Sequence, residues 1–431
     1  MSQVARQALG RMVKARPDEI RAMLWAFVYF FCLLTSYYIL RPLRDESGVA
    51  AGVGNLQWLF TGTFFVMLAA APLFGALVTR VPRRRFIPWI YRFFAATLLV
   101  FFALGYLMPR QPYVAGAFFI WVSVFNLFVV TVFWGFMADL FSNEQGRRLF
   151  GFIAAGGSAG ALLGPSLTAW LAVPLGPVNL LLISALLLEA AVQCVRQLLE
   201  TPQAQRPAEQ EAAQSANEEV IGGGIFAGLT EIAKSPFLML ICAHVLLLSL
   251  TSTFLYFQQA SIVSAAFDNP AERTRFFALI DLSVGITTIV IQLSITGHVL
   301  VKLGVGVALA SLAIVTMGGF LALALIPTLV VLVIFQAVKR AVEFGFANPA
   351  RETLFTVVTR EQKYKAKSVI DTAVFRGGDA VNGWIYTGLR MLGLDLSGIA
   401  LVAVPISAAW AALLLLIGRK QEQLAQAQPR R

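Results

Sequence analysis

Long apolar segments recur along almost the whole chain, and they restrict its fold more than any other feature of the sequence. A bilayer core about 30 Å thick is crossed by about 20 apolar residues in a helix. The pattern predicts an all-α membrane protein with twelve transmembrane helices. Segments of this length, separated by short polar stretches, lie near 22–42, 57–79, 87–107, 112–139, 151–173, 176–195, 237–258, 276–299, 302–324, 327–346, 368–392 and 396–418.

The composition agrees with a lipid environment. Of the 431 residues, 58% are hydrophobic and only 13% are charged, whereas about a quarter of the residues in a soluble domain are charged. The net charge of +11 could indicate a nucleic-acid partner. Most basic residues, however, fall on one side of the predicted helices, as cytoplasmic loops require. We therefore expect a lipid bilayer and no nucleic acid as partner, an inner-membrane location, and both termini in the cytoplasm.

The residues that commonly carry catalysis or bind metals are sparse. The three cysteines, Cys32, Cys194 and Cys242, lie in apolar segments, and the two histidines, His244 and His298, are far apart in the sequence. No phosphate-binding loop or metal-ligand spacing is present. We expect no enzymatic activity, no cofactor and no metal, so any transport would be driven by gradients.

A polar stretch divides the apolar segments into two groups of six. Residues 196–234 predict a cytoplasmic linker between halves 1–195 and 235–431. Two six-helix halves joined in this way resemble the major facilitator superfamily, whose members usually act as monomers. Gly160-x-x-x-Gly164-Pro165 resembles the helix-five motif of antiporters in that superfamily. Close helix packing alone also explains these glycines, and we favour that interpretation.

Charged residues inside the predicted helices are the strongest functional signal, because each is costly in lipid unless it is paired or faces water. In one interpretation they form ion pairs that only neutralise one another. In the other, the excess of positive groups binds an anionic solute, while the carboxylates act as gates or carry protons. The candidate substrate-binding residues are Tyr38, Arg41, Arg44, Lys339, Arg340 and Arg376, and the candidate gating or proton-carrying residues include Asp45, Glu343 and Asp379.

Three stretches resemble one family more than the superfamily at large. Residues 38–45 (Tyr-Ile-Leu-Arg-Pro-Leu-Arg-Asp) look like the first-helix signature of the nucleotide transporter family, the ATP/ADP translocases of plastids and intracellular bacteria. Residues 133–136 with 143–151 are similar to that family's stretch between helices four and five. Glu352 with residues 361–371 looks like the stretch that leads into helix eleven.

The resemblance implies exchange of nucleotide-like anions through a basic cavity. It places Arg44 where the family has a substrate-binding lysine and Glu144 on a functional acidic position. Two departures bear on the substrate. Arginine changes the geometry at position 44, and Gly378-Asp379 stands where the family has a Gly-Lys pair, which reverses a charge. The resemblance therefore supports the family more strongly than it supports a triphosphate substrate.

The sequence thus predicts a secondary transporter, an antiporter of a nucleotide-like organic anion, that works by alternating access and acts as a monomer. Tyr37 or Tyr38 would stack on a ring of the solute. The alternative is a proton-coupled exporter of drugs, peptides or sugars, in which Glu343 or Asp379 carries the proton.

Overall fold

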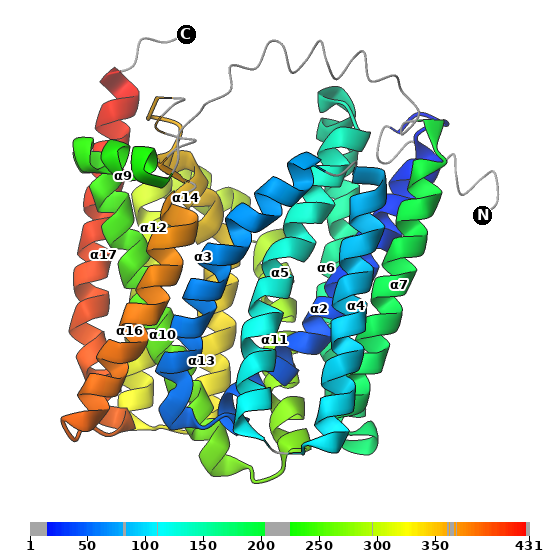
Figure 1. Cartoon of the computed structure of the whole chain (residues 1–431). Helices are drawn as coiled ribbons and strands as arrows, with labels where there is room; N and C mark the ends of the chain where they lie inside the picture. The colour runs from blue at the N-terminus through cyan, green and yellow to red at the C-terminus, as the bar shows by residue number, and fades with distance from the viewer. Residues whose placement is uncertain are drawn as a thin grey trace. The chain divides into compact units, whose positions relative to one another are not determined.

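The computed structural model describes residues 15–80, 83–109, 111–202, 225–294, 296–359, 362, 366–367, 369–427. Within these ranges every regular element is a helix, and Figure 1 shows their course. Much of the predicted linker, residues 203–224, lies outside the described residues, as do residues 360–361 and 363–365 of the stretch before helix eleven.

The helices of the amino-terminal part follow the apolar segments. Their bounds are α2 (Ile20–Ala50), η1 (Val53–Asn55), α3 (Leu56–Arg80), α4 (Arg83–Leu107), α5 (Pro112–Leu140), α6 (Asn143–Leu175), η2 (Pro177–Asn179) and α7 (Leu180–Leu199). Several of them extend beyond the apolar segment that predicted them. Helix α2, for example, continues past Pro42 through a charged stretch to Ala50.

The carboxy-terminal part begins with a short amphipathic helix, α9 (Ile225–Lys234). Long helices and two π-helical turns follow it. They are α10 (Pro236–Ala266), α11 (Pro270–Ser294), α12 (Thr296–Leu325), α13 (Leu329–Val342), η4 (Glu343–Ala347), α14 (Asn348–Leu354), η5 (Ile370–Val374), α16 (Phe375–Met391) and α17 (Leu396–Ala427).

Among the described residues, ten helices are long and apolar enough to cross a membrane. The predicted segments 327–346 and 368–392 are not among these ten. Each is interrupted by a π turn, which leaves α13 with 14 residues and α16 with 17. Each also carries several charged residues. The all-helical membrane fold is therefore confirmed, while the count of twelve spans stays a prediction.

The chain forms two compact units. Unit 1 comprises Met1–Ala51, Val66–Glu219 and Asp268–Leu282, and unit 2 comprises Gly52–Phe65, Val220–Phe267 and Ser283–Arg431. Helices α3 and α11 are thus divided, since each contributes its first part to one unit and the rest to the other. Unit 1 consequently includes a segment from the carboxy-terminal part of the sequence.

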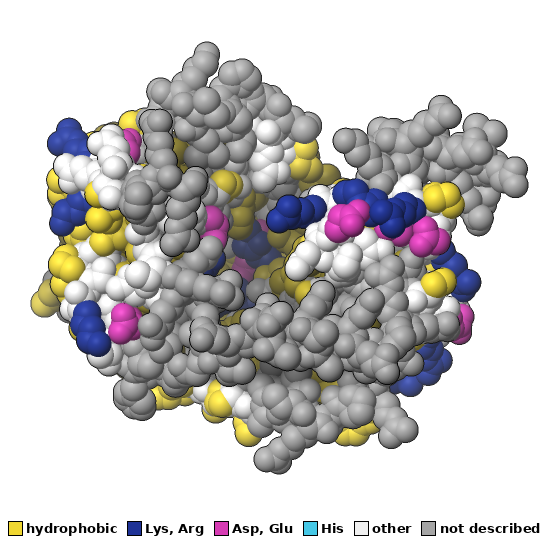
Figure 2. Space-filling view, turned by 90° about the horizontal axis from the view of Figure 1, so that it is seen from above, with side chains coloured by type: hydrophobic (Ala, Val, Ile, Leu, Met, Phe, Trp, Pro, Cys, Tyr) yellow, Lys and Arg dark blue, Asp and Glu magenta, His cyan; other side chains and the backbone are white. Residues whose placement is uncertain are grey.

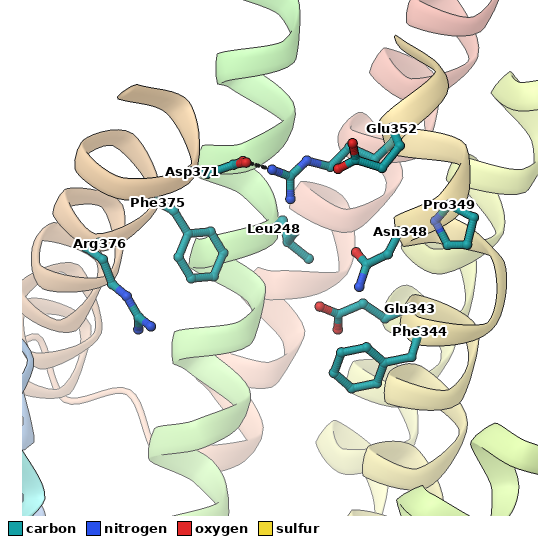
Figure 3. A pocket seen from close by; sticks show the side chains of 10 residues that line it. Leu248, Glu343, Phe344, Asn348, Pro349, Glu352, Asp371, Phe375 and Arg376 are labelled. Atoms are coloured by element: carbon teal, nitrogen blue, oxygen red, sulfur yellow. Dashed lines mark hydrogen bonds and ion pairs between the residues drawn. The ribbon is translucent and has the colours of Figure 1, made fainter. Parts of the chain in front are cut away.

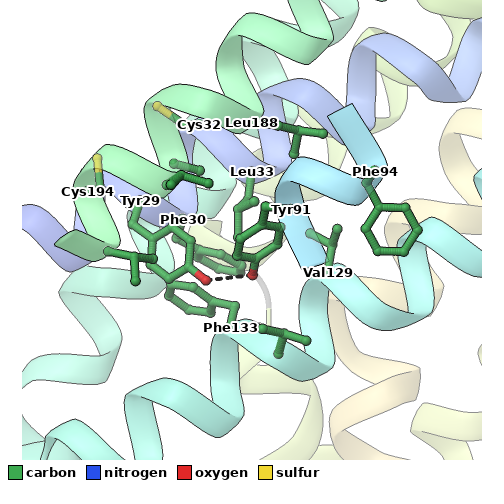
Figure 4. Close-up of a cluster of buried hydrophobic side chains, with 14 of the residues drawn as sticks. Tyr29, Phe30, Cys32, Leu33, Tyr91, Phe94, Val129, Phe133, Leu188 and Cys194 are labelled. Atoms are coloured by element: carbon green, nitrogen blue, oxygen red, sulfur yellow. Dashed lines mark hydrogen bonds between the residues drawn. The ribbon is translucent and has the colours of Figure 1, made fainter. Parts of the chain in front are cut away.

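Aromatic side chains fill the core of unit 1. Phe30 of α2 stacks on Phe133 of α5 with ring centres 4.1 Å apart. The hydroxyls of Tyr29 and Tyr91 lie 2.5 Å apart in a hydrogen bond, and both side chains are fully buried (Figure 4). Each hydroxyl therefore finds its polar partner inside the protein rather than in lipid.

The glycine-rich face of α6 packs against α2. A Cβ at Gly160 would lie 2.6 Å from the carbonyl oxygen of Phe31, and one at Gly164 would lie 2.7 Å from the Cβ of Tyr38. Small residues allow this close approach of two backbones. The packing interpretation of these glycines is therefore supported, and the contact fixes the part of α2 that carries the cations.

Unit 2 buries a histidine between two helices. The indole nitrogen of Trp410 on α17 donates a hydrogen bond of 3.0 Å to Nδ1 of His244 on α10. Both side chains are buried. Because Nδ1 accepts this bond, His244 is the neutral tautomer that carries its proton on Nε2.

Candidate functional site

The last turns of α2 place polar side chains among the apolar helices of unit 1. The Arg41 and Arg44 side chains are each 20% exposed, and Asp45 and Glu46 are buried. Residues three or four apart share one face of an α-helix. The sequence stretch therefore brings two guanidinium groups to one side of α2.

Each guanidinium group contacts a carboxylate and an aromatic ring. Nε of Arg41 lies 3.6 Å from Oδ2 of Asp281, and Nη1 of Arg44 lies 3.8 Å from Oδ1 of Asp45. The Arg44 guanidinium also lies 4.2 Å from the centre of the Phe119 ring, a cation–π distance. The Arg41 guanidinium lies 5.9 Å from the ring of Tyr38. Both cations are thus charge-compensated and flanked by aromatic faces.

A second ion pair joins the end of α2 to the start of α11 within unit 1. Nε and Nη2 of Arg273 donate to Oε2 and Oε1 of Glu46 at 2.6 and 2.9 Å. This bidentate geometry is the strongest form of the pair. Asp281 and Arg273 were not among the sequence candidates. The sequence signal for Asp281 was its position as a single aspartate within an apolar segment. The sequence does not indicate which residue pairs with it.

Unit 2 contains a cavity of about 650 Å³ whose wall is strongly charged. Two π-helical turns contribute to it, since Glu343 and Phe344 belong to η4 and Asp371 belongs to η5. Turns of this kind widen a helix by one residue and occur often at functional sites. Figure 3 shows the two groups of side chains coming from different helices.

Arg376 of α16 lines this cavity, and a carboxylate outside the cavity lining pairs with its guanidinium group. Its Nη1 lies 3.4 Å from Oδ2 of Asp379, and Ser249 of α10 donates to Oδ1 of the same carboxylate at 2.7 Å. Asn382 donates in turn to the Ser249 hydroxyl at 3.1 Å. The carboxylate is therefore held by the neutral Ser249 donor as well as by the guanidinium, and Asn382 in turn fixes the Ser249 hydroxyl.

Lys339 and Arg340 of α13, which the sequence predicted to bind the substrate, differ from each other in their surroundings. Lys339 is only 3% exposed, and its Nζ lies 3.0 Å from the Ser252 hydroxyl and 3.5 Å from Oε2 of Glu343. Lys339 does not line the cavity, whereas Glu343 does. The guanidinium of Arg340 lies 6.0 Å from the centre of the Phe344 ring.

Two further ion pairs lie at the cavity, and the sequence candidates included none of their members. Arg351 pairs with Asp371, and Lys367 pairs with Glu352. Arg351, Glu352 and Asp371 all line the cavity. Residues 352 and 371 bound the stretch that resembles the nucleotide transporters. The sequence therefore indicated this region, but it did not predict which residues form ion pairs there.

Glu144 lies away from the cations of α2. It is exposed at the first turn of α6, where it contacts Arg16 and Arg148 at 3.4 and 3.7 Å. Arg148 also binds Glu19 at the start of α2. Arg41 follows Glu19 by 22 residues (41 − 19) on that helix, a separation of roughly 33 Å. The structure does not bring Glu144 together with Arg41 and Arg44.

The paired carboxylates change the charge balance that the sequence suggested. The excess of positive groups expected from the sequence did not include the carboxylates of Asp281 and Glu189, which pair with Arg41 and with Arg92 of α4. Basic and acidic side chains also lie next to one another on the face in Figure 2. In the described part of the chain, no three His, Cys, Asp or Glu side chains lie close enough together to hold a metal ion.

Long apolar helices with ion pairs buried among them define an integral membrane protein of the transporter class. A sequence model of the Major Facilitator Superfamily matches residues 23–366. The chain belongs to this superfamily. The superfamily resemblance expected from the sequence is therefore confirmed.

Two relatives carry the resemblance further. The chain is 20% identical to ADP,ATP carrier protein 1 of Chlamydia muridarum (strain MoPn / Nigg) over 463 aligned positions, which cover 91% of this chain and 87% of that protein. ADP,ATP carrier protein 1 of Chlamydia trachomatis serovar D has the same identity and coverage. The predicted similarity to nucleotide transporters is confirmed at the level of a divergent relative.

Solved structures share the fold. The nucleoside transporter NupG superposes with a TM-score of 0.59 at 13% identity, covering 96% of this chain and 100% of that one. A POT family transporter in complex with 5-aminolevulinic acid superposes with a TM-score of 0.63 at 9% identity, covering 94% and 96%. At these identities the likeness concerns the fold alone.

Proposed function

We propose that the protein is a secondary active transporter that exchanges nucleotide-like organic anions across the inner membrane by alternating access. In this proposal two six-helix halves, 1–195 and 235–431, are joined by a cytoplasmic linker, 196–234. The two halves rock about a central site, both termini are cytoplasmic, and the protein acts as a monomer. Similarity to ADP,ATP carriers over 91% of the chain supports this proposal.

The observation that carries the proposal is the pair of half-buried arginines on α2. Arg41 and Arg44 project from the stretch that resembles the first-helix signature of nucleotide transporters, beside aromatic rings. A guanidinium group binds phosphate or carboxylate in a bidentate manner. Tyr38 adds a ring on which a base can stack. These groups suit an anion that also has an aromatic part.

The ion pairs supply a means of exchange. Asp281 neutralises Arg41 across a distance of 3.6 Å. An anionic solute competes for the same guanidinium group, and its phosphate can form shorter, bidentate hydrogen bonds. In unit 2 we assign the anion to Arg376 and Arg340, while the buried Lys339 acts through Glu343. Asp45, Glu144, Glu343 and Asp379 stay candidates for gating or proton transfer.

A second function is favoured by a separate observation. The side chains of Asp281 and Asp379 are only 3% and 12% exposed, as expected for carboxylates that take up and release protons during transport. A proton-coupled exporter of drugs, peptides or sugars would use them in this way. Transport of a neutral or cationic solute that depends on a pH gradient would support this alternative.

The proposal is tested by uptake of labelled ATP and ADP into proteoliposomes preloaded with unlabelled nucleotide. We expect counterflow with the wild-type protein and its loss in Arg44→Ala. Arg92→Ala is the matched control, because Arg92 also forms an ion pair within the membrane-spanning helices but is exposed on α4. No counterflow by folded wild-type protein would overturn the nucleotide assignment, and equal loss in both variants would remove Arg44 from the site.

A further inference from the structure

We infer that the exposed face shared by α4 and α7 binds the phosphate group of an anionic phospholipid, held by the guanidinium groups of Arg92 and Arg196. Both helices belong to unit 1 and pack against each other (Figure 1). Neither arginine lines the cavity of unit 2. The inference therefore goes beyond the proposed function and does not depend on which solute is transported.

Apolar side chains surround the site on both helices. On α4, Trp89 is 75% exposed and Phe93 is 54% exposed, and on α7, Leu186 is 71% exposed. Each lies within one helical turn of Arg92 or Glu189, and both helices are long and apolar enough to cross a membrane. Exposed apolar side chains on a membrane-spanning helix are solvated by lipid. The face shared by α4 and α7 is therefore in contact with lipid.

An ion pair lies within this apolar surface. Nε and Nη2 of Arg92 donate to Oε2 and Oε1 of Glu189 at 3.1 and 2.9 Å, and the two side chains are 46% and 42% exposed. Charged groups inside a membrane are costly and rare, and they mark functional sites. Joining α4 to α7 does not by itself require an ion pair that faces lipid. Its exposure therefore indicates that a polar group from the membrane binds there.

A chain of hydrogen bonds leads from this ion pair along α7. Nε2 of Gln193 donates to Oε1 of Glu189 at 2.5 Å, and Nη1 of Arg196 donates to Oε1 of Gln193 at 3.3 Å. Residues 189, 193 and 196 lie on one face of the helix, because they are four and three residues apart. Arg196 lies in the last turn of α7. The chain of polar groups thus extends from the membrane-spanning part of α7 to its end.

The unused hydrogen-bonding groups of this chain are mainly donors. Glu189 already accepts hydrogen bonds from Nε and Nη2 of Arg92 and from Gln193. Among the described residues, no hydrogen bond engages Nη1 of Arg92, or Nε and Nη2 of Arg196. Guanidinium groups bind phosphate through charge-assisted hydrogen bonds. The site therefore matches a phosphate rather than an ammonium headgroup, which has only donors.

The two arginines lie at a depth that suits a lipid headgroup. Tyr106, near the end of α4, donates to Asn179, just before α7, so the two helices are antiparallel. The start of α4 therefore lies beside the end of α7, which carries Arg196. Trp89 lies less than one turn from Arg92 toward this end, and tryptophan favours the membrane interface. Because arginine side chains extend toward that interface, a phosphate near Trp89 lies within reach of both guanidinium groups.

The test is equilibrium binding of lipids to the full-length, delipidated protein, measured by native mass spectrometry. The probes are phosphatidylglycerol, phosphatidylethanolamine and phosphatidylcholine with identical acyl chains, of which only phosphatidylglycerol has a net negative charge. Arg196→Gln removes a donor without breaking an ion pair of the described residues. Arg92→Gln/Glu189→Gln removes both members of the ion pair and leaves the net charge unchanged. Arg419→Gln is the control, because Arg419 is exposed on α17 of unit 2.

We expect wild type and Arg419→Gln to bind phosphatidylglycerol at least about ten-fold more tightly than either other lipid. Arg196→Gln should reduce this preference by about five-fold. Arg92→Gln/Glu189→Gln should reduce it by a similar factor, although its net charge equals that of wild type. Because Arg196→Gln leaves every described ion pair intact, it tests the site even where the double variant does not fold.

Four results would overturn the inference. One is equal binding of the three lipids by wild type, and another is an equal loss of preference in Arg419→Gln, which would indicate general attraction to a basic protein. The third is tighter binding of phosphatidylethanolamine that is lost in Arg92→Gln/Glu189→Gln, which would assign an ammonium group to Glu189. The fourth is a dimer that is lost in the same variant, which would assign this face to a second copy of the chain.

Discussion

Arg41 of α2 and Asp281 of α11 form an ion pair within unit 1, although 240 residues (281 − 41) separate them in the sequence. Asp281 is buried, and the Arg41 side chain is 20% exposed. Removing one partner of a buried pair leaves an uncompensated charge, which costs more than the pair itself contributes. The pair therefore binds the first part of α11 to α2 as long as both members are present.

A double-mutant cycle measures this coupling. Arg41→Gln and Asp281→Asn should each lower the free energy of unfolding. The double variant should be less destabilised than the sum of the two, with a coupling free energy of about 1–3 kcal/mol. Thermal unfolding in detergent provides the measurement. Additive effects would mean that the two side chains do not interact.

Gly160 gives a prediction about the contact between α2 and α6. Gly160→Ala should destabilise the protein by about 1–3 kcal/mol, because the added Cβ would lie 2.6 Å from the Phe31 carbonyl oxygen. Gly151→Ala on the same helix is the control, since nothing lies within 4 Å of its Cβ position. This control should be neutral or stabilising by up to about 1 kcal/mol. Equal effects of the two variants on the unfolding temperature would contradict the described packing.

His244 is expected to stay neutral during transport. Trp410→Phe should destabilise the protein by about 1–3 kcal/mol, because it leaves the buried Nδ1 acceptor without its hydrogen bond. The dependence of transport on pH between about 5.5 and 8, measured in proteoliposomes, should be the same in wild type and His244→Gln. A shifted pH profile in the histidine variant would instead identify His244 as a proton carrier.

The start of α2 should respond to acid. Burial raises the pKa of Glu19, but hydrogen bonds from the Arg148 side chain, the Arg16 backbone and Gln145 outweigh this effect and hold the pKa below its ordinary value. A lowered pKa contributes stability that is present above the unfolded-state pKa and lost as the pH falls through the folded one. The unfolding temperature should therefore decrease when the pH is lowered below about 4.

Glu19→Gln removes this titration. At neutral pH it should cost about 2 kcal/mol, because two hydrogen bonds from Arg148 lose their charged acceptor. Below about pH 4 the difference between variant and wild type should shrink. Thermal unfolding of both proteins measures this difference in stability. A difference that stays constant from pH 3 to pH 7 would show that Glu19 does not titrate in this way.

Hydropathy predicts the helices of this protein well because each lipid-spanning helix must be apolar over its length. The segments 112–139 and 396–418 correspond to α5 and α17, which begin at Pro112 and Leu396. Helix α2 is longer than predicted, since its charged end remains helical and finds partners inside unit 1. The two π turns were not predicted, because a change in backbone hydrogen bonding leaves no mark in an apolar pattern.

The candidate site was predicted in part. Intramembrane charge identified Arg41, Arg376 and Glu343, since such groups are costly and rare in lipid. The partners Asp281 and Ser249 depend on which helices are neighbours, and periodicity along one helix contains no such information. The excess of positive groups was therefore inferred without the carboxylate of Asp281.

The central claim, exchange of nucleotide-like anions, is tested most directly by trans-stimulation. Uptake of labelled ADP is measured in proteoliposomes that are either empty or preloaded with unlabelled nucleotide, each with and without a pH gradient. An antiporter should take up ADP rapidly only into preloaded vesicles, whether or not the gradient is present. Uptake of ADP into empty vesicles would contradict antiport. The absence of ADP uptake in every condition, by protein shown to be folded, would contradict nucleotide transport.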